Sequence, residues 1–406
     1  MLGNRRASGS SDHLQDLCLI LGDKMTPNLT GTGTGLLLAE AEVVTEQKPI
    51  SRKPLPQTKT PVKPTGPKYE WHIVWRNVLA FAYLHTGALY GMYLVFTQAK
   101  LATCFYVLFV SWYSGMGITA GAHRLWAHKC YKANAALRLL LAFCNSSAFQ
   151  NHIYEWVRDH RVHHKFTDTD ADPHNSNRGF FFSHMGWLLV RKHGDVRHKG
   201  KAIDMSDLEK DWVVMFQKNF YPILMPICTF VIPTMVPVYL WGEDGWTAWY
   251  VAAVMRYTLV LHGTWLVNSA AHMWGTRPYD KFISPVENVY VGVLAFGEGW
   301  HNYHHAFPWD YKTSEFSGYS ANATTAFIDF FAWLGWAYDL KTVKAEMIEK
   351  RAIRTGDGSH PADKQNTNKD HRHGIEGEIW GWDDKDLTDK DREMMSIINP
   401  KEEKTE

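Results

Sequence analysis

The sequence predicts an all-α integral membrane protein in which four transmembrane helices form two hairpins and carry a cytosolic helical cap. Three observations predict this fold. Four runs of about 20 residues are nearly free of charge, long enough to cross a bilayer. A basic segment separates the second run from the third, and histidines cluster at helical spacing within and beyond it. We therefore expect the cap to contain a histidine-rich site for two metal ions.

Composition limits the class of protein further. The net charge of +1 over 406 residues predicts no nucleic-acid partner. The 5 cysteines are odd in number and lie far apart without a Cys-x2-Cys pair, which is typical of reduced thiols and not of a disulfide framework or a zinc ribbon.

Residues 1–68 are expected to be a disordered arm. They are rich in Thr, Gly, Pro and Lys, hold five prolines between Pro54 and Pro67, and show no hydrophobic periodicity. No cleavable signal peptide is evident, because no small-residue cleavage pattern follows a basic start. The membrane domain is then predicted to cover residues 69–358, with a polar tail over 359–406 that is disordered or loosely docked.

The spans are predicted at residues 77–99, 101–122, 219–242 and 246–268. Only Lys100 separates the first two spans, so they form a hairpin. The third contains four prolines, which membrane helices tolerate where neighbouring groups satisfy the freed backbone. The fourth is charged only at Arg256, which we expect to face protein and to be paired, since exposing it to lipid would cost at least about 2.5 kcal/mol.

Charge predicts the orientation. Residues 123–218 carry 15 Lys and Arg, whereas Glu243 and Asp244 are the charges between the third and fourth spans. The positive-inside rule therefore places a cap of residues 123–218 and 272–355 in the cytosol, together with both termini. We expect a multi-pass protein of the endoplasmic reticulum membrane.

Eight histidines carry the chemistry. His160, His163 and His164 share one helix face by their i, i+3, i+4 spacing, and the same spacing returns in His301, His304 and His305, preceded by the looser pair His123 and His128. Any single histidine is more often a surface or satisfied core residue, but the repeated pattern indicates ligands for two metals. Imidazole suits iron, zinc, copper and nickel.

Five stretches carry a resemblance to a known family. They are Gly-Ile-Thr-Ala-Gly-Ala-His-Arg-Leu-Trp (117–126), Trp-Val-Arg-Asp-His-Arg-Val-His-His-Lys-Phe (156–166), Asp-Pro-His-Asn (172–175), Trp-Leu-Val-Asn-Ser-Ala-Ala-His (265–272) and Gly-Glu-Gly-Trp-His-Asn-Tyr-His-His (297–305). The chain resembles the membrane acyl-CoA desaturases of the stearoyl-CoA Δ9 type, and Ile-Trp-Gly-Trp-Asp-Asp (379–384) is similar to insect members.

This resemblance implies a complete ligand set. It adds His272 as a ninth histidine and Asn268 as a ligand through water, and the two are i and i+4 at the end of the fourth span. It also implies two Fe2+ ions, O2 as co-substrate, and electrons from cytochrome b5 and its reductase. Acidic residues near the histidines are candidates to orient the imidazole rings: Glu155, Asp159, Asp168, Asp172 and Glu298. His152, His174, His184 and His262 keep a structural interpretation.

The resemblance also implies residues for a long-chain acyl-CoA. Positions that bind substrate on the CoA side are Asn77, Asn151, Arg158, Asp159, Arg191 and Lys192. Trp156, Thr264 and Trp265 match positions that bend the acyl tunnel, and Ser111 and Gly115 match its closed end. Other readings stay open: Arg191 and Lys192 can be a juxtamembrane basic pair, and Ser111 and Gly115 can serve close helix packing.

The predicted activity is insertion of a cis double bond, at Δ9, into a saturated long-chain acyl-CoA. The alternatives are another position such as Δ11, a related membrane di-iron fatty acyl hydroxylase, or a non-catalytic metal transporter. A transporter would place its ligands near the bilayer midplane, whereas these histidines lie at span ends and in the cap.

Overall fold

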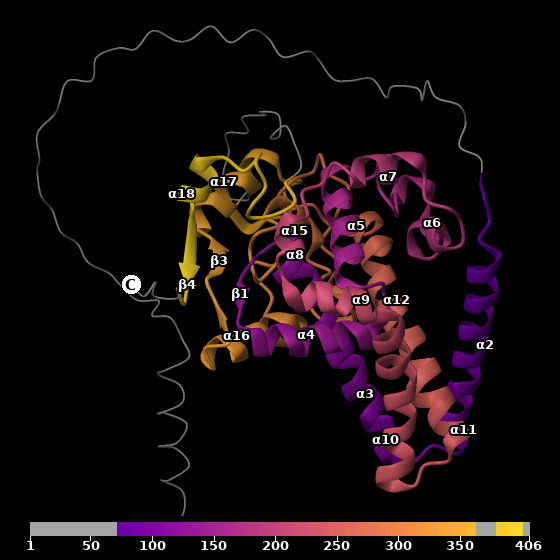
Figure 1. Cartoon of the computed structure of the whole chain (residues 1–406). Helices are drawn as coiled ribbons and strands as arrows, with labels where there is room; N and C mark the ends of the chain where they lie inside the picture. Colours follow the sequence, from indigo (N-terminus) through magenta and orange to yellow (C-terminus); the bar gives the residue numbers. More distant parts are fainter. Residues whose placement is uncertain (1–70, 363–378, 401–406) are drawn as a thin grey trace, which may run out of the picture. The chain divides into compact units, whose positions relative to one another are not determined.

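The computed structural model describes residues 71–362 and 379–400 (Figure 1). The arm expected at residues 1–68 lies outside the described residues. The described part is mostly helical: a bundle of long apolar helices descends from a cap of shorter helices and loops (Figure 1).

Three helices are long and apolar enough to cross a membrane. The first is α2 (Trp75–Thr97). The second is α3 (Leu101–Met116), which continues into the π-helical η1 (Gly117–Ala127). The third joins α9 (Trp212–Pro226), the π-helical η4 (Ile227–Val231) and α10 (Ile232–Trp241). They cover the first three predicted spans, although the second and third run on into the cap.

The fourth predicted span falls on three consecutive helical elements, α11 (Gly245–Ala248), the π-helical η5 (Trp249–Met255) and α12 (Arg256–Asn268). It is not among the three helices of spanning length and apolarity. Its buried positions explain its lower apolarity, because Val251, Val254 and Tyr257 pack against α2 and α3 and not against lipid. A helix surrounded by protein can carry polar groups that a lipid-facing helix cannot.

Arg256 is fully buried, as expected, and its partners are backbone carbonyls. Its guanidinium donates to Thr229 O (2.6 Å) and Ser147 O (3.0 Å). Pro233, four residues after Thr229, has no N–H to offer that carbonyl, and α4 ends one residue after Ser147. Arg256 therefore satisfies the backbone where a proline and a helix end would leave it unpaired.

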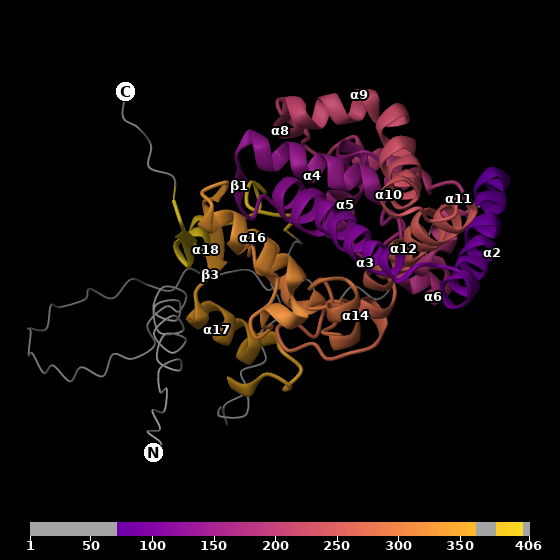
Figure 2. The same cartoon turned by 90° about the horizontal axis from the view of Figure 1, so that it is seen from below.

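The cap packs against the upper end of the bundle (Figure 1). Its larger helices are α4 (Ala135–Ala148), α5 (Ile153–Lys165), α16 (Ala323–Trp333) and α17 (Ala345–Thr355). Shorter elements complete it: η2 (Ser176–Arg178), α6 (Phe180–His184), η3 (Gly186–Leu188), α7 (Gly194–Gly200), α8 (Ser206–Glu209), α13 (Ala270–Met273), α14 (Val289–Leu294), α15 (His301–Ala306), η6 (Tyr319–Ala321) and α18 (Asp389–Glu393). Seen from below, α9 lies along α4 (Figure 2). Trp126, Leu141, Val157 and Ile328 belong to the largest core cluster, which joins α4, α5 and α16 to η1.

Two short antiparallel sheets depart from the all-α prediction. β1 (Lys132–Ala133) pairs with β2 (Ala337–Tyr338), and β3 (Leu340–Val343) pairs with β4 (Met395–Ile398), with Leu340 opposite Ile398. The second pair also changes the description of the C-terminal tail. Residues 379–400 are packed against the cap, and Leu387 and Met395 lie in a hydrophobic cluster with Val343 and Ile348. The polar composition of this segment gave no sign that a few apolar residues, such as Leu387 and Met395, would be buried.

Candidate metal centre

The predicted ligands come from four places in the fold. His123 lies in η1 and His128 directly follows it. Three histidines lie on α5, whose first turn is capped by the His152 ring accepting from Glu155 N (3.1 Å). The remaining predicted ligands are His272 on α13 and three histidines on α15.

The π-helical turn explains how the looser pair is brought together. In a regular α-helix, residues five apart point about 140° away from each other. In η1, His128 N donates instead to His123 O (3.1 Å), an i to i+5 bond. This places the two rings 4.7 Å apart between centroids.

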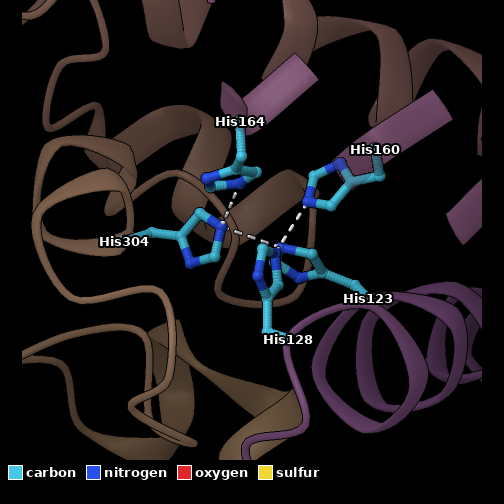
Figure 3. Close-up of side chains that lie close together, drawn as sticks. All are labelled: His123, His128, His160, His164 and His304. Carbon is cyan, nitrogen blue, oxygen red and sulfur yellow. Dashed lines mark hydrogen bonds between the residues drawn. The ribbon is translucent and has the colours of Figure 1, made fainter. Parts of the chain in front are cut away.

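The structure gathers the nine histidines into two groups, and in each group one nitrogen per ring lies within 4.8 Å of the others. The first group is His123, His128, His160, His164 and His304 (Figure 3). The second is His163, His272, His301 and His305.

The clusters on α5 and α15 are each divided between the two groups, whereas His123 and His128 both belong to the first. His160 and His164, one turn apart on α5, enter the first group, while His163 between them enters the second. On α15 the division is reversed, because His301 and His305 enter the second group and His304 the first. The two groups are therefore neighbours, and His164 and His305 stack with ring centroids 4.1 Å apart.

The ring nitrogens fit bound cations. His304 Nε2 lies 3.0 Å from both His123 Nε2 and His164 Nε2, and His128 Nε2 lies 2.8 Å from His160 Nε2. In the second group His301 Nε2 lies 3.1 Å from His272 Nε2. Two nitrogens bound at right angles to one ion, each about 2.1 Å away, are about 3.0 Å apart. His304 has one Nε2 proton at most and cannot donate to both neighbours, and nitrogens that converge in this way can hold a metal ion.

The other ring nitrogens contact acceptors that fix the tautomer. His123 Nδ1 lies 2.8 Å from Glu298 and His163 Nδ1 lies 2.9 Å from Asp172, while His272 Nδ1 is 3.5 Å from Asp168. A carboxylate at Nδ1 holds the proton there and leaves the Nε2 lone pair for a metal. Three of the five acidic candidates therefore lie where rings can be oriented. Glu155 and Asp159 instead pair with Arg158.

Burial favours the neutral form at six of the nine imidazoles. Loss of water, followed by the neighbouring rings, holds the pKa well below its ordinary value at six of the nine histidines: His128, His160, His164, His301, His304 and His305. Neutral imidazole is the form that binds metal.

The acceptors are charged despite their burial. Burial alone would raise the pKa of the Glu298 carboxyl, but Arg124 and His123 beside it hold that pKa below its usual range. Burial is likewise outweighed at Asp172, where His163 and His174 lower the pKa. Arg124 is a functional neighbour that sequence reasoning missed: it is fully buried and donates to Glu298 Oε1 at 2.8 Å and 3.1 Å.

The histidines given a structural interpretation lie outside both groups. His184 and His262 hydrogen-bond to each other (2.9 Å). His174 lies beside His163 and Asp172, closer to the centre than its sequence position indicated, and burial lowers its pKa to about 3.

A cavity of about 530 Å³ adjoins the first group. Six of the predicted substrate residues line it: Asn77, Asn151, Trp156, Asp159, Thr264 and Trp265. Exposed Arg76 is also in its wall, so this cavity reaches the surface near the start of α2. Arg158, Arg191 and Lys192 are not in the wall. Lys192 and Arg158 instead both contact Asp159, which is in the wall.

A second cavity, of about 470 Å³, is mostly apolar and reaches the two residues predicted at the end of the acyl tunnel. Ser111 and Gly115 line it together with Leu108, Val260 and Phe296. The two cavities adjoin each other, because Trp156, His160, Thr264 and Asn268 line both. Asn268, the predicted ligand through water, thus lies between the cavities and near His163 and His301, which also line the second.

Two further features near the centre were not predicted. Phe296 presses against Gly115, where an added Cβ would come within 2.3 Å of the phenyl ring. The carbonyl of Trp380, from the segment expected to be a loose tail, accepts a hydrogen bond from His128 Nδ1. Neither has a spacing signal in the sequence, because each joins residues more than 180 positions apart.

A helical bundle with buried histidine groups beside an apolar cavity matches one known class of protein. The family model for fatty acid desaturases matches residues 99–314. The chain belongs to the fatty acid desaturase family. Its three apolar helices of bilayer-spanning length place it among membrane proteins.

Three individual relatives are similar to this chain over most of its length. The chain is 58% identical over 368 residues to the acyl-CoA Delta-9 desaturase of Acheta domesticus, covering 90% of this chain and 97% of the relative. It is 56% identical over 335 residues to the acyl-CoA Delta12-desaturase of the same organism, covering 82% and 89%. It is 55% identical over 305 residues to the acyl-CoA Delta(11) desaturase of Spodoptera littoralis, covering 75% and 90%. Similar identities to enzymes named for three positions leave the position of the double bond undecided.

Proposed function

We propose that the chain is an acyl-CoA desaturase that inserts a cis double bond at C9 of a saturated long-chain acyl-CoA. The observation that carries this proposal is the pair of adjoining cavities, one reaching the surface near Arg76 with polar side chains in its wall, the other almost wholly apolar, which meet at His160 and Asn268 beside both histidine groups. An acyl chain lying through them would pass the metal centre at a fixed carbon.

In this proposal two Fe2+ ions bind, one in each histidine group, with Asn268 completing the second through water. When bound, iron supplies the activation of O2 that removing hydrogen from an unactivated methylene requires, and O2 takes up two hydrogens, two electrons and two protons to leave as two waters. Redox-inert zinc would fit the imidazoles but cannot supply this chemistry.

The open cavity receives the CoA part. Asn77 donates to Leu188 O (2.7 Å) and is thereby held in the wall, while Asn151 adopts a positive φ of 72°. Arg158, Arg191 and Lys192 supply positive charge for the phosphates of CoA. Since Arg158 and Lys192 are paired with Asp159, the mouth offers an ordered ionic network and not free cations.

Where the cavities meet, the wall fixes the reacting carbons. The Trp156 ring stacks on His160 with centroids 4.8 Å apart, and Gln150 donates to Thr264 Oγ1 (2.9 Å). Trp265 is buried in α12. These fixed side chains would bend the acyl chain at the centre and exclude water from it.

The proposal extends to partners and location. Electrons would come from cytochrome b5 and its reductase at the cytosolic face of the endoplasmic reticulum membrane. There, residues 69–358 would form a domain with four spans, the fourth being residues 246–268, and with both chain termini in the cytosol.

The test is expression in cells that lack their own Δ9 desaturase, followed by location of double bonds in their fatty acids. A C9 double bond in 16- and 18-carbon chains is expected. A double bond at C11 or C12 would contradict the position, and hydroxylated or unaltered chains would contradict the proposed activity.

A further inference from the structure

Residues 379–387, here called the C-terminal strap, lie directly on the backbone of His128. The Trp380 carbonyl accepts from His128 Nδ1, and Trp382 N donates to His128 O (3.1 Å). A carbonyl oxygen only accepts, so the ring proton is on Nδ1 and Nε2 carries a lone pair. Nε2 is the nitrogen that faces His160 within the five-histidine group.

The fit between strap and ligand leaves no space. A Cβ added at Gly381 would lie 2.6 Å from His128 O and 2.8 Å from His128 Cα. Both are backbone atoms, which cannot swing aside as a flexible side chain can. Glycine is therefore the residue that allows the strap to approach this closely.

Charged groups beside the ligands hold the strap in place. Buried Asp384 accepts from Trp380 N (2.8 Å) and from the amine of Lys165 (2.8 Å), the neighbour of His164. The Arg161 guanidinium lies 4.2 Å from the Trp380 ring centroid and is itself held by Asp207 (2.7 Å). A desolvated guanidinium over the face of an indole is held there by a favourable cation–π interaction.

The strap also packs into the hydrophobic core around α15, which carries His301, His304 and His305. Leu387 lies in the same hydrophobic cluster as Tyr303 and Phe307, which flank His304 on α15. Its anchoring is thus built from buried contacts as well as ion pairs.

The contact with His128 parallels the carboxylate contacts of the other rings. His123, His163 and His272 have Nδ1 acceptors supplied by carboxylates of the cap, while the acceptor for His128 comes from the strap. Partners of this kind commonly change metal affinity 10- to 100-fold when removed.

We propose that the C-terminal strap is a positioning element of the five-histidine site, which fixes the tautomer and orientation of His128 and so retains one of the two metals. This rests on the proposed function. Because binding couplings are reciprocal, metal in the five-histidine site also strengthens docking of the strap.

The test compares full-length variants purified with iron. Gly381→Ala forces the strap away from His128, and Asp384→Ala removes its link to Lys165. Matched controls are Gly318→Ala, where an added Cβ meets nothing within 4 Å, and Asp389→Ala at an exposed position of the following helix. Iron per chain and its rate of loss to a chelator are measured.

We expect the wild type and both controls to hold two irons, and both strap variants to lose one of the two at least about tenfold faster. Loss of both irons together would indicate general destabilisation and would overturn the proposal, as would wild-type rates in both strap variants. A wild type without iron would instead overturn the proposed function.

Hydrogen exchange of the full wild-type chain gives an independent readout that does not depend on a variant folding. Removing iron should speed exchange at the Trp380 and Trp382 amides while leaving the β3 and β4 amides unchanged. Equal exchange of the strap with and without iron would contradict the coupling.

Discussion

At the scale of single residues, the function of each histidine is decided by its two ring nitrogens. His163 directs Nδ1 to Asp172 and belongs to the four-histidine group, whereas His198 on α7 is exposed and belongs to neither group. The same side chain is therefore a proposed metal ligand in one place and a surface residue in the other.

His163→Ala should abolish desaturation while leaving membrane insertion intact, because one metal loses a ligand and Asp172 loses its partner. His198→Ala is the control and should retain wild-type turnover. Desaturated product and iron content are measured in membranes from both variants. Normal turnover and iron content in His163→Ala would contradict the ligand assignment.

Chain length is also decided by single residues. Gly115→Ile should shift preference toward shorter chains, since the added carbons project into the apolar cavity and against Phe296. Two excluded methylenes correspond to about 1.6 kcal/mol, or roughly fifteenfold in relative kcat/KM. Phe296→Ala should shift preference the other way by enlarging the same end.

The measurement is competition among 14-, 16- and 18-carbon acyl-CoA in microsomes, with Ser111→Ala as a control that changes little volume. We expect the wild type to accept 18 carbons at least as well as 16. An unchanged product ratio in both Gly115→Ile and Phe296→Ala would mean that the chain ends elsewhere.

Sequence spacing predicted these residues but not their grouping. The i, i+3, i+4 pattern places His160, His163 and His164 on one helix face, yet it cannot show that the middle histidine serves a different group from its neighbours. That division depends on where α15 and α13 dock, which no local pattern contains. The π turn between His123 and His128 was equally invisible to a rule based on regular helices.

At the scale of elements, the π-helical segments η4 and η5 lie beside Arg256, the one charge of the fourth predicted span. The prediction that Arg256 faces protein and is paired is confirmed, and its partners are carbonyls that Pro233 and the end of α4 leave free. One buried guanidinium thus donates hydrogen bonds to a carbonyl at the end of α4 and to a carbonyl in η4.

Arg256→Leu should lower the free energy of unfolding by about 1–3 kcal/mol, because buried carbonyls of Ser147 and Thr229 lose their donor. Arg256→Lys should recover part of this loss. The measurement is thermal unfolding in detergent, with Leu240→Ala on the exposed face of α10 as the control. A wild-type Tm for Arg256→Leu would show that these hydrogen bonds do not stabilise the bundle.

Uncharged runs predicted the positions of the long helices because lipid-facing surfaces tolerate few charges. An apolar run does not guarantee one continuous helix: in the stretch 179–190, α6 ends at His184 and η3 begins at Gly186, with Met185 between them. At this break the side chains of His184 and Ser269 are hydrogen-bonded (2.9 Å), a contact between residues 85 positions apart that no local pattern contains.

At the scale of the whole molecule, function depends on where the bundle and cap meet, because both histidine groups and both cavities lie at this junction. The C-terminal strap belongs to this junction as well. Its polar composition indicated a loose tail. The contacts that dock it could not be predicted, because they are to His128 and Lys165, more than 200 residues earlier in the chain.

The orientation can be tested by thiol labelling in microsomes, using a chain whose own five cysteines are replaced by Ala. With four spans, Lys210→Cys in the cap should react with a membrane-impermeant maleimide in intact vesicles. Asp244→Cys, in the exposed connection before α11, should react only after the vesicles are opened. Labelling of Asp244→Cys in intact vesicles would contradict the proposed topology.

The central claim, that nine histidines hold two irons where the two cavities meet, is tested most directly by anomalous X-ray scattering at the iron edge from crystals of the purified protein. The account predicts two iron peaks, one within His123, His128, His160, His164 and His304, and one within His163, His272, His301 and His305. A single peak, or peaks outside these two groups, would contradict it.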